Sequence, residues 1–538
     1  MSSLSPIHTA TDDNPSKRDR SPSLAKSCPA VYEAISSEDD STLVNSGATS
    51  SKSRTSSRRS DETQLHHQTV HTVKLSSLEH CMPRSYIRIV VAYKLVNGSE
   101  MDQAIEKLQD FVQRIVRAKP YLAGRVVATD MGDGRGSRPE IVFTAHDYLY
   151  YPSVRIDKLL DKHGHLLKYE ELDHAACPPS WLPPEIVLKD LKPDVDPKNA
   201  APVFRMQVNL LDGGMVVALY LHHVISDGTG LDLITSGQVL DDQYTFRWQP
   251  DFLSEHDSTL DAALEHFAQE KSKVRQLLSQ TPADRTHLRQ IRAVHLDQPP
   301  PPKNPPGRGC IIQISRGRIA TMKKDFNDKE KSSGKWHTTN SVLMALLWRH
   351  MIRARRPTVP TVQTSALLIP ANLRTTVEPN LPESYFGAAV DCSRAELDLD
   401  TLVQGGADRL FHISQTIREA ASQINDDYVK ELISFSNNAD STIDLADIQA
   451  SNMDRVHGAD MYITSWMEFG TYKHDLGMGI GAPDWVRKPW SRDPGSCIIL
   501  PRDDRKDYLE AVVQMTTDEM TRLLQDEEFL RNVERVID

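Results

Sequence analysis

The chain is poor in the features that mark secreted and membrane-spanning proteins. Its six cysteines are scattered and form no C-x-x-C pair, which argues against a disulfide framework or a zinc-ribbon site and fits a reducing compartment. No apolar run approaches the length that a bilayer requires. Residues 1–50 lack the apolar core of a secretory signal. We therefore expect a soluble, cytoplasmic protein with no membrane partner.

Positive charge is also in short supply. Lysine and arginine total 63 against 74 acidic residues, giving a formal net charge of -11. This balance argues against nucleic acid or an anionic membrane as the main partner. The histidines and carboxylates show no H-E-x-x-H or similar spacing, so we expect no metal site. The 538 residues are too many for one core, whereas 39% hydrophobic residues suffice for two.

Composition divides the chain into four parts. Residues 1–70 are rich in serine, threonine and charge, and this composition predicts a disordered tail. A proline-rich segment, residues 298–308, predicts a stiff linker. We expect it to separate an N-terminal domain, residues 71–297, from a C-terminal domain, residues 309–538. Both regions mix helical and strand-like segments without strict alternation, which predicts a mixed α/β fold.

Hydrophobic periodicity predicts elements in both halves. Strands are expected at residues 86–96, 203–211, 215–221, 310–314, 362–369, 462–467 and 508–515. Helices are expected at residues 229–240, 259–278, 340–353 and 517–524. A further helix is expected to be capped by Ser99 and to stop at Pro120, with Ile105 and Leu108 on its apolar face.

The run LHHVISDGTG, residues 221–230, is the most informative local pattern. His223 stands at the exit of a strand, and its ordinary pKa suits a general base. Asp227 can reach the same imidazole only through a sharp turn, which Gly228 would relax. We expect His222 to face the opposite way, since adjacent strand residues alternate. The 20 histidines make an accidental match the alternative, so other segments must decide.

Seven such segments occur in order over residues 75–530. They are LSSLEHCMPRSYIR (75–88), KPYLAGRV (119–126), TTNSVLMALLWRHMIRAR (338–355), NLRTTVEPNLPESYFGAAV (372–390), TSW (464–466), HDLGMGIG (474–481) and DYLEAVVQMTTDEMTRLLQDEEF (507–529). Together with the H-x-x-x-D-G run, they resemble the BAHD acyltransferase family, in particular its fungal trichothecene-acetyltransferase-like branch. Two departures are visible. Leu476 and Met478 replace the aromatic residues of D-F-G-W-G, and Ala388 replaces the usual asparagine after Y-F-G.

The resemblance implies an α/β fold of two chloramphenicol-acetyltransferase-like domains. Each would be a mixed sheet flanked by helices, and their interface would form a central channel around His223. The implied activity is acyl-CoA-dependent transfer of an acyl group, most simply acetyl, to a hydroxyl of a fungal secondary metabolite. Acetyl-CoA would be a co-substrate, no cofactor would be bound permanently, and the enzyme would be a monomer.

The resemblance also implies roles for individual residues. His223 would be the general base, and Asp227 would be a structural residue of the active-site loop that pairs with Arg374. Thr464 and Trp466 match positions assigned to oxyanion stabilisation or positioning, although ordinary strand packing is the alternative for both.

Further implied roles concern the coenzyme A side of the channel. Asp475, Gly477 and Gly479 would be structural residues of a bend beneath that channel. Basic groups near the helix of the second domain would meet the CoA phosphates, and Thr338, Thr339 and Tyr385 are the weaker contact candidates.

Other activities stay open at this stage. A condensation-domain-like protein also carries H-H-x-x-x-D-G, but the chain lacks a carrier-protein or adenylation region and has a C-terminal D-x-G-x-G. An N-acyltransferase would use the same base on an amine. A catalytically silent ligand-binding relative is disfavoured by the intact His223, Asp227 and Gly228.

Overall fold

A computed structural model supplies the fold. It describes residues 70–73, 75–95, 98–130, 137–149, 151, 154–189, 191, 200–240, 307–378, 380–381, 384–438, 445, 455, 458–489 and 494–538. The expected helix at 259–278 lies outside these residues, as do nearly all of the expected tail, 1–70, and most of the expected linker, 298–308. The domain limits drawn from composition therefore stay predictions.

A five-stranded sheet carries the segment that leads to the H-x-x-x-D-G run. Its order is β13-β2-β8-β7-β5, with β5 parallel to β7 and the other neighbours antiparallel. β8 lies at the centre of this sheet and is buried along its whole length, and its continuous apolar run fits a strand whose two faces are both covered. The strands are β2 (Tyr86–Lys94), β5 (Arg155–Lys158), β7 (Phe204–Leu211), β8 (Gly214–His222) and β13 (Trp485–Arg487).

Two further sheets complete the strand framework. An antiparallel sheet of order β1-β4-β3-β6 contains β1 (Val70–Val73), β3 (Arg125–Asp130), β4 (Ser137–Thr144) and β6 (Ala201–Pro202). The larger one, of order β11-β10-β12-β14-β15-β9-β16, contains β9 (Gly307–Ser315), β10 (Thr364–Asn372), β11 (Val390–Asp398), β12 (Met461–Ser465), β14 (Ser496–Ile499), β15 (Tyr508–Thr516) and β16 (Val533–Ile537). In this sheet β12 is parallel to both neighbours, and the other pairs are antiparallel.

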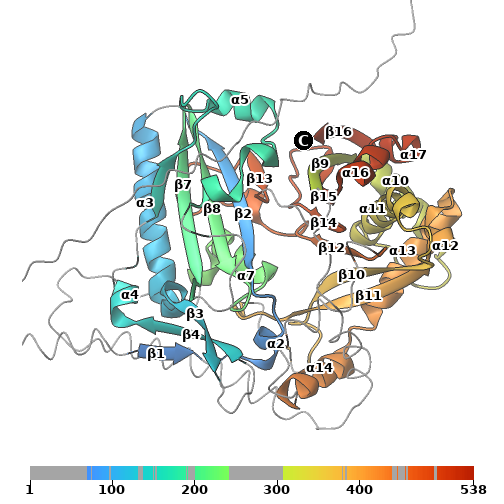
Figure 1. The fold of residues 1–538 in the computed structure, drawn as a ribbon, viewed down its shortest axis with the longest axis horizontal. Coiled ribbons are helices and arrows are strands. Elements are labelled where there is room, and N and C mark those ends of the chain that lie inside the picture. Colours follow the sequence, from blue (N-terminus) through green and yellow to red (C-terminus); the bar gives the residue numbers. More distant parts are fainter. Residues whose placement is uncertain are drawn as a thin grey trace, which may run out of the picture. The chain divides into compact units, whose positions relative to one another are not determined.

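Helices flank these sheets. Figure 1 shows α3 (Gly98–Ala118) alongside the five-stranded sheet, and α11 (Thr339–Arg355) packs on α13 (Ala407–Ser422), which lies against β11. The other α-helices are α2 (Ser77–His80), α4 (Ala145–Leu149), α5 (Tyr169–His174), α6 (Pro184–Val187), α7 (Gly228–Ser236), α10 (Arg316–Lys329), α12 (Leu399–Val403), α14 (Asp426–Asn438), α16 (Thr517–Leu523) and α17 (Glu527–Leu530). Within the described ranges, no helix has the length and apolar character needed to cross a membrane.

Two helix ends differ from the sequence-based prediction. Ser99 is not the cap of α3, because the helix already includes Gly98 and so places Ser99 in its first turn. The helix expected at 229–240 ends at Ser236. Gly237 adopts a left-handed conformation with φ of 77°, which ends an α-helix, and a short 3-10 turn (Gln238–Leu240) follows.

β13 departs from the order of the chain. It belongs to the second half of the sequence, yet it pairs with β2 of the first half over Trp485 to Arg487. The buried Arg487 forms an ion pair with Glu510 of β15 at 2.8 Å, and it also donates to the carbonyls of Ala176 and Cys177. One short strand is thus bonded both to the five-stranded sheet and to the seven-stranded sheet.

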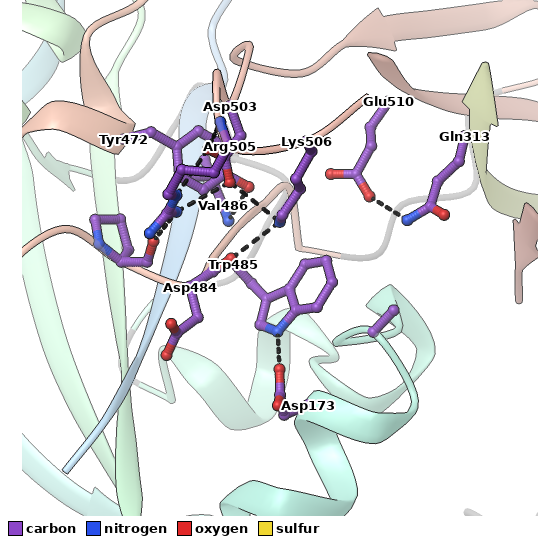
Figure 2. A network of polar contacts seen from close by, with 12 residues as sticks. Asp173, Gln313, Tyr472, Asp484, Trp485, Val486, Asp503, Arg505, Lys506 and Glu510 are labelled. Atoms are coloured by element: carbon purple, nitrogen blue, oxygen red, sulfur yellow. Dashed lines mark hydrogen bonds and ion pairs between the residues drawn. The ribbon is translucent and has the colours of Figure 1, made fainter. Parts of the chain in front are cut away.

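Aromatic and basic side chains surround the same junction. The indole N–H of Trp485 donates to Asp173 at 2.7 Å, and Glu510 accepts a bond from Gln313 (Figure 2). The ammonium group of Lys506 lies 3.8 Å from the ring centroid of Trp485, a cation–π geometry. These contacts fix β13 and the loop that precedes it.

Candidate functional site

His223 follows β8 directly. Its backbone N–H donates to the carbonyl of Ser85 at 2.8 Å, which fixes the strand exit. The side chain is half-buried with its Nδ1 enclosed by the protein, so Nε2 is the nitrogen left for an acceptor hydroxyl. Burial lowers the pKa of His223, and the nearby Asp227 carboxylate acts in the opposite direction. The neutral imidazole that results can accept a proton.

His222 lies in different surroundings. It is fully buried, and its ring meets the Tyr86 ring edge-on with centroids 5.1 Å apart. Its Nδ1 accepts the N–H of Val224 at 3.2 Å, so the ring helps to shape the turn after β8. Burial lowers the pKa of His222 to about 3. His222 is therefore a packed, neutral histidine.

Asp227 caps α7. Its Oδ1 accepts the N–H groups of Thr229 at 2.9 Å and Gly230 at 3.2 Å, which would otherwise be unpaired at the helix start. Its Oδ2 accepts the N–H of Ala389 at 2.8 Å. Arg374 donates to both oxygens, at 2.8 and 3.1 Å. This buried carboxylate is fully engaged in holding the loop, which supports a structural role.

Arg374 connects this loop to the second half of the chain. Besides Asp227, it binds the carbonyls of Tyr385 at 3.0 Å and Gly387 at 2.7 Å, and the Oδ1 of Asn372 at 3.1 Å. The guanidinium is 1% exposed, so its charge is compensated entirely by these contacts. The structure thus brings together Asp227 and Arg374, two of the residues singled out from the sequence.

Trp466 reaches the same helix start. It follows β12, and its N–H donates to the carbonyl of Ile499. Its indole Nε1 lies 3.6 Å from the point where a Cβ on Gly228 would stand, and its ring stacks on Phe469 with centroids 5.8 Å apart. Thr464, near the end of β12, is half-buried. Their roles toward an oxyanion stay predictions.

The D-L-G-M-G segment forms a tight bend. The Asp475 carboxylate accepts the N–H groups of Gly477 and Ile480, each at 3.0 Å. Gly477 and Gly479 both have a φ of 74°, which favours glycine. Asp475 therefore satisfies the backbone of its own turn. The two replaced aromatic positions, Leu476 and Met478, are buried in the core of the first half.

Each of the three residues expected to contact CoA interacts with another residue of the chain. Thr338 caps α11 by accepting the N–H of Ser341 at 3.0 Å, and the hydroxyl of Thr339 accepts a bond from Lys323 at 3.3 Å. Tyr385 is buried, under the guanidinium of Arg374. Lys323 supplies a basic group beside α11, but contacts of these residues with CoA stay predictions.

The described segments hold no group of three or more His, Cys, Asp or Glu side chains suited to a metal ion.

One half-buried acid escaped the sequence analysis. Asp232 of α7 accepts the N–H of Gly470 at 2.9 Å, and burial raises its pKa to about 6. The signal was present in the sequence, since Asp232 is the lone charged residue in the helix GTGLDLITS. It was missed because its partner is 238 positions away.

Comparisons with known proteins identify the family. A model described as the Transferase family matches residues 180–530. The chain belongs to this family. A second model, the trichothecene 3-O-acetyltransferase-like N-terminal domain, matches residues 85–237. Together the two matches confirm the resemblance to the fungal acetyltransferase branch that the motifs indicated.

Similar proteins and a solved structure give the same result. The O-acetyltransferase ptmV of Penicillium ochrochloron is 22% identical over 84% of this chain and 94% of that protein. The trichothecene 8-O-acetyltransferase of Fusarium sporotrichioides is 23% identical over 85% of this chain and 97% of that protein. The crystal structure of F. graminearum TRI101 with coenzyme A and deoxynivalenol superposes with a TM-score of 0.69 at 17% identity, covering 87% of this chain and 100% of that one. The expected fold class is confirmed.

Proposed function

We propose that this protein is an acyl-CoA-dependent O-acyltransferase, with acetyl-CoA as donor, that acylates a hydroxyl of a fungal secondary metabolite. The observation that carries the proposal is the geometry at His223. A neutral imidazole stands at the strand exit with one nitrogen enclosed, while Asp227 is bound to Arg374. The similar O-acetyltransferases, and the TRI101 structure with coenzyme A, support the donor and the acceptor class.

The proposed chemistry needs few groups. His223 removes the proton from the acceptor hydroxyl as its oxygen attacks the thioester carbonyl. When the tetrahedral intermediate collapses, the C–S bond breaks and the CoA sulfur takes the proton from His223 and leaves as the thiol. Thr464 and Trp466 would stabilise the oxyanion or position the substrate. The thioester is already activated, so no nucleophilic serine or cysteine is required. We therefore propose direct transfer in a ternary complex by a monomeric, cytoplasmic enzyme that binds no metal and no permanent cofactor.

The test is a kinetic one. Purified full-length protein is incubated with acetyl-CoA and a panel of terpenoid, alkaloid and polyketide alcohols, and release of free thiol is followed. Acceptor-dependent thiol release, with initial-rate lines that intersect at several fixed acceptor concentrations, is the expected result. Parallel lines and an acyl-enzyme seen by intact mass would contradict direct transfer. A panel of amines run in parallel distinguishes an N-acyltransferase.

A further inference from the structure

The first turns of α7 contact one turn of the second half of the chain at two points. Gly228 and Asp232 are four residues apart on this helix, so they share one face. At Gly228, a Cβ would lie 2.8 Å from Cζ of Phe469 and 3.6 Å from Nε1 of Trp466. At Asp232, the carboxylate accepts the N–H of Gly470 at 2.9 Å. One face of α7, which Asp227 caps, therefore contacts the Trp466–Gly470 turn.

This turn is held by the stacked rings of Trp466 and Phe469 and by backbone hydrogen bonds. Its first hydrogen bond runs from the N–H of Phe469 to the carbonyl of Trp466 at 2.9 Å, and the carbonyl of Gly470 accepts from Lys473 at 2.7 Å. The N–H of Gly470 points outward from the turn, to the Asp232 carboxylate. Because that bond joins the turn to α7, it limits how far Trp466 can move relative to the start of the helix.

The setting of Asp232 favours a role in activity over a role in stability. The carboxyl is half-buried, and burial raises its pKa to about 6, while the Gly470 amide, Thr235 and Lys473 act in the opposite direction. His474 also faces this region, with its ring 3.4 Å from the position of a Cβ on Gly470. An ionised carboxylate in such a place destabilises the fold, and groups of that kind are concentrated at functional sites.

We propose that Asp232 is a positioning residue for acyl transfer: it holds the Trp466–Gly470 turn on α7 and so keeps the Trp466 indole beside Gly228, next to Asp227. The inference rests on the proposed function for its kinetic consequence, but the restraint on the turn does not depend on it. A shift of about 1 Å in a positioning group can lower a rate by about 10²-fold.

Two substitutions separate the parts of this proposal. Asp232→Ala removes the acceptor for the Gly470 N–H, whereas Asp232→Asn keeps an acceptor oxygen and removes the charge. Ser236→Ala serves as the control on the same helix, since the Ser236 hydroxyl donates within α7 to the Leu233 carbonyl. Amide hydrogen exchange over residues 466–470 and the kcat for thiol release are measured for all variants at pH 7.5.

The expected results differ between the variants. In Asp232→Ala, exchange at Gly470 accelerates about tenfold or more, kcat falls about 10- to 100-fold, and the melting temperature does not fall. Asp232→Asn and the control keep both exchange and kcat near wild type. A melting temperature that falls with kcat would assign Asp232 a merely structural role and overturn the proposal.

Two other outcomes would also overturn it: unchanged exchange at Gly470 in Asp232→Ala, or an Asn variant as impaired as the Ala variant. The exchange result stands on the protein alone, so it tests the restraint even if no acceptor gives thiol release. An inactive wild-type protein with the expected exchange pattern would count against the proposed function and not against the restraint.

Discussion

Arg374 donates hydrogen bonds from both of its terminal nitrogens to the carboxylate of Asp227, at 2.8 and 3.1 Å, although it lies 147 residues further along the chain. Each partner is almost fully buried. The pair therefore joins the loop that presents His223 to the segment before β11, and the position of the proposed base depends on a contact between two distant parts of the sequence.

Removing either partner is expected to be costly. Asp227→Ala leaves the Arg374 guanidinium buried and unpaired, which lowers the free energy of unfolding by about 3–5 kcal/mol. Because the two residues share one contact, their effects should not add. A double-mutant cycle by urea unfolding should give a coupling energy of about 0.5–3 kcal/mol. Additive losses would mean that the ion pair contributes nothing of its own.

The acid limb of activity should report His223. Burial lowers the pKa of His223 below its ordinary value of 6.5. The base is active when neutral, so kcat/KM should be level at neutral pH and fall only as the pH drops through a midpoint below 6.5. The profile should be the same in the Asp232→Asn variant, because the bond from the Gly470 N–H needs an acceptor oxygen at residue 232 and not a charge. A midpoint above 6.5 in that variant would contradict this assignment.

The stability of the protein should also depend on Asp232. Its pKa is raised from 3.8 to about 6, so the ionised form is disfavoured in the fold. The destabilisation is absent below pH 4, grows up to pH 6 and is complete above it. Two pKa units correspond to about 3 kcal/mol, an upper bound for a half-buried group. Asp232→Asn should therefore unfold at higher urea than wild type at pH 7.5, and the two should converge at pH 4. An equal difference at both pH values would show that ionisation is not the cause.

Gly477 should resist substitution. Its φ of 74° is unfavourable for other residues, and a Cβ would stand 3.0 Å from Cδ2 of Phe111 of α3. Gly477→Ala should lower the free energy of unfolding by about 1–2 kcal/mol for the backbone alone, with the crowding at Phe111 in addition. Gly164→Ala is the matched control, since Gly164 has a φ of 80° with nothing within 4 Å. Equal losses of unfolding free energy in the two variants would show that crowding at Phe111 adds no destabilisation.

The sequence predicted local features more reliably than distant pairings. The strand that leads to His223 could be predicted because β8 is uniformly apolar, and the bend at Asp475 because its glycines mark a turn. The Asp227–Arg374 pair came from the family resemblance, since spacing alone cannot place residues 147 positions apart. Tertiary packing sets the pairing of β13 with β2 and the bond from Gly470 to Asp232. Hydrophobic periodicity reports local helices and strands, so it could not predict these distant contacts.

His223, as the general base, is the residue on which the proposed reaction depends most. The direct measurement is acyl transfer by His223→Ala, followed as thiol release from acetyl-CoA with an acceptor that the wild-type enzyme uses. Circular dichroism and the melting temperature establish that the variant is folded. The rate should fall by about 10²-fold or more while the fold is unchanged. Thiol release near the wild-type rate in a folded His223→Ala protein would contradict the mechanism.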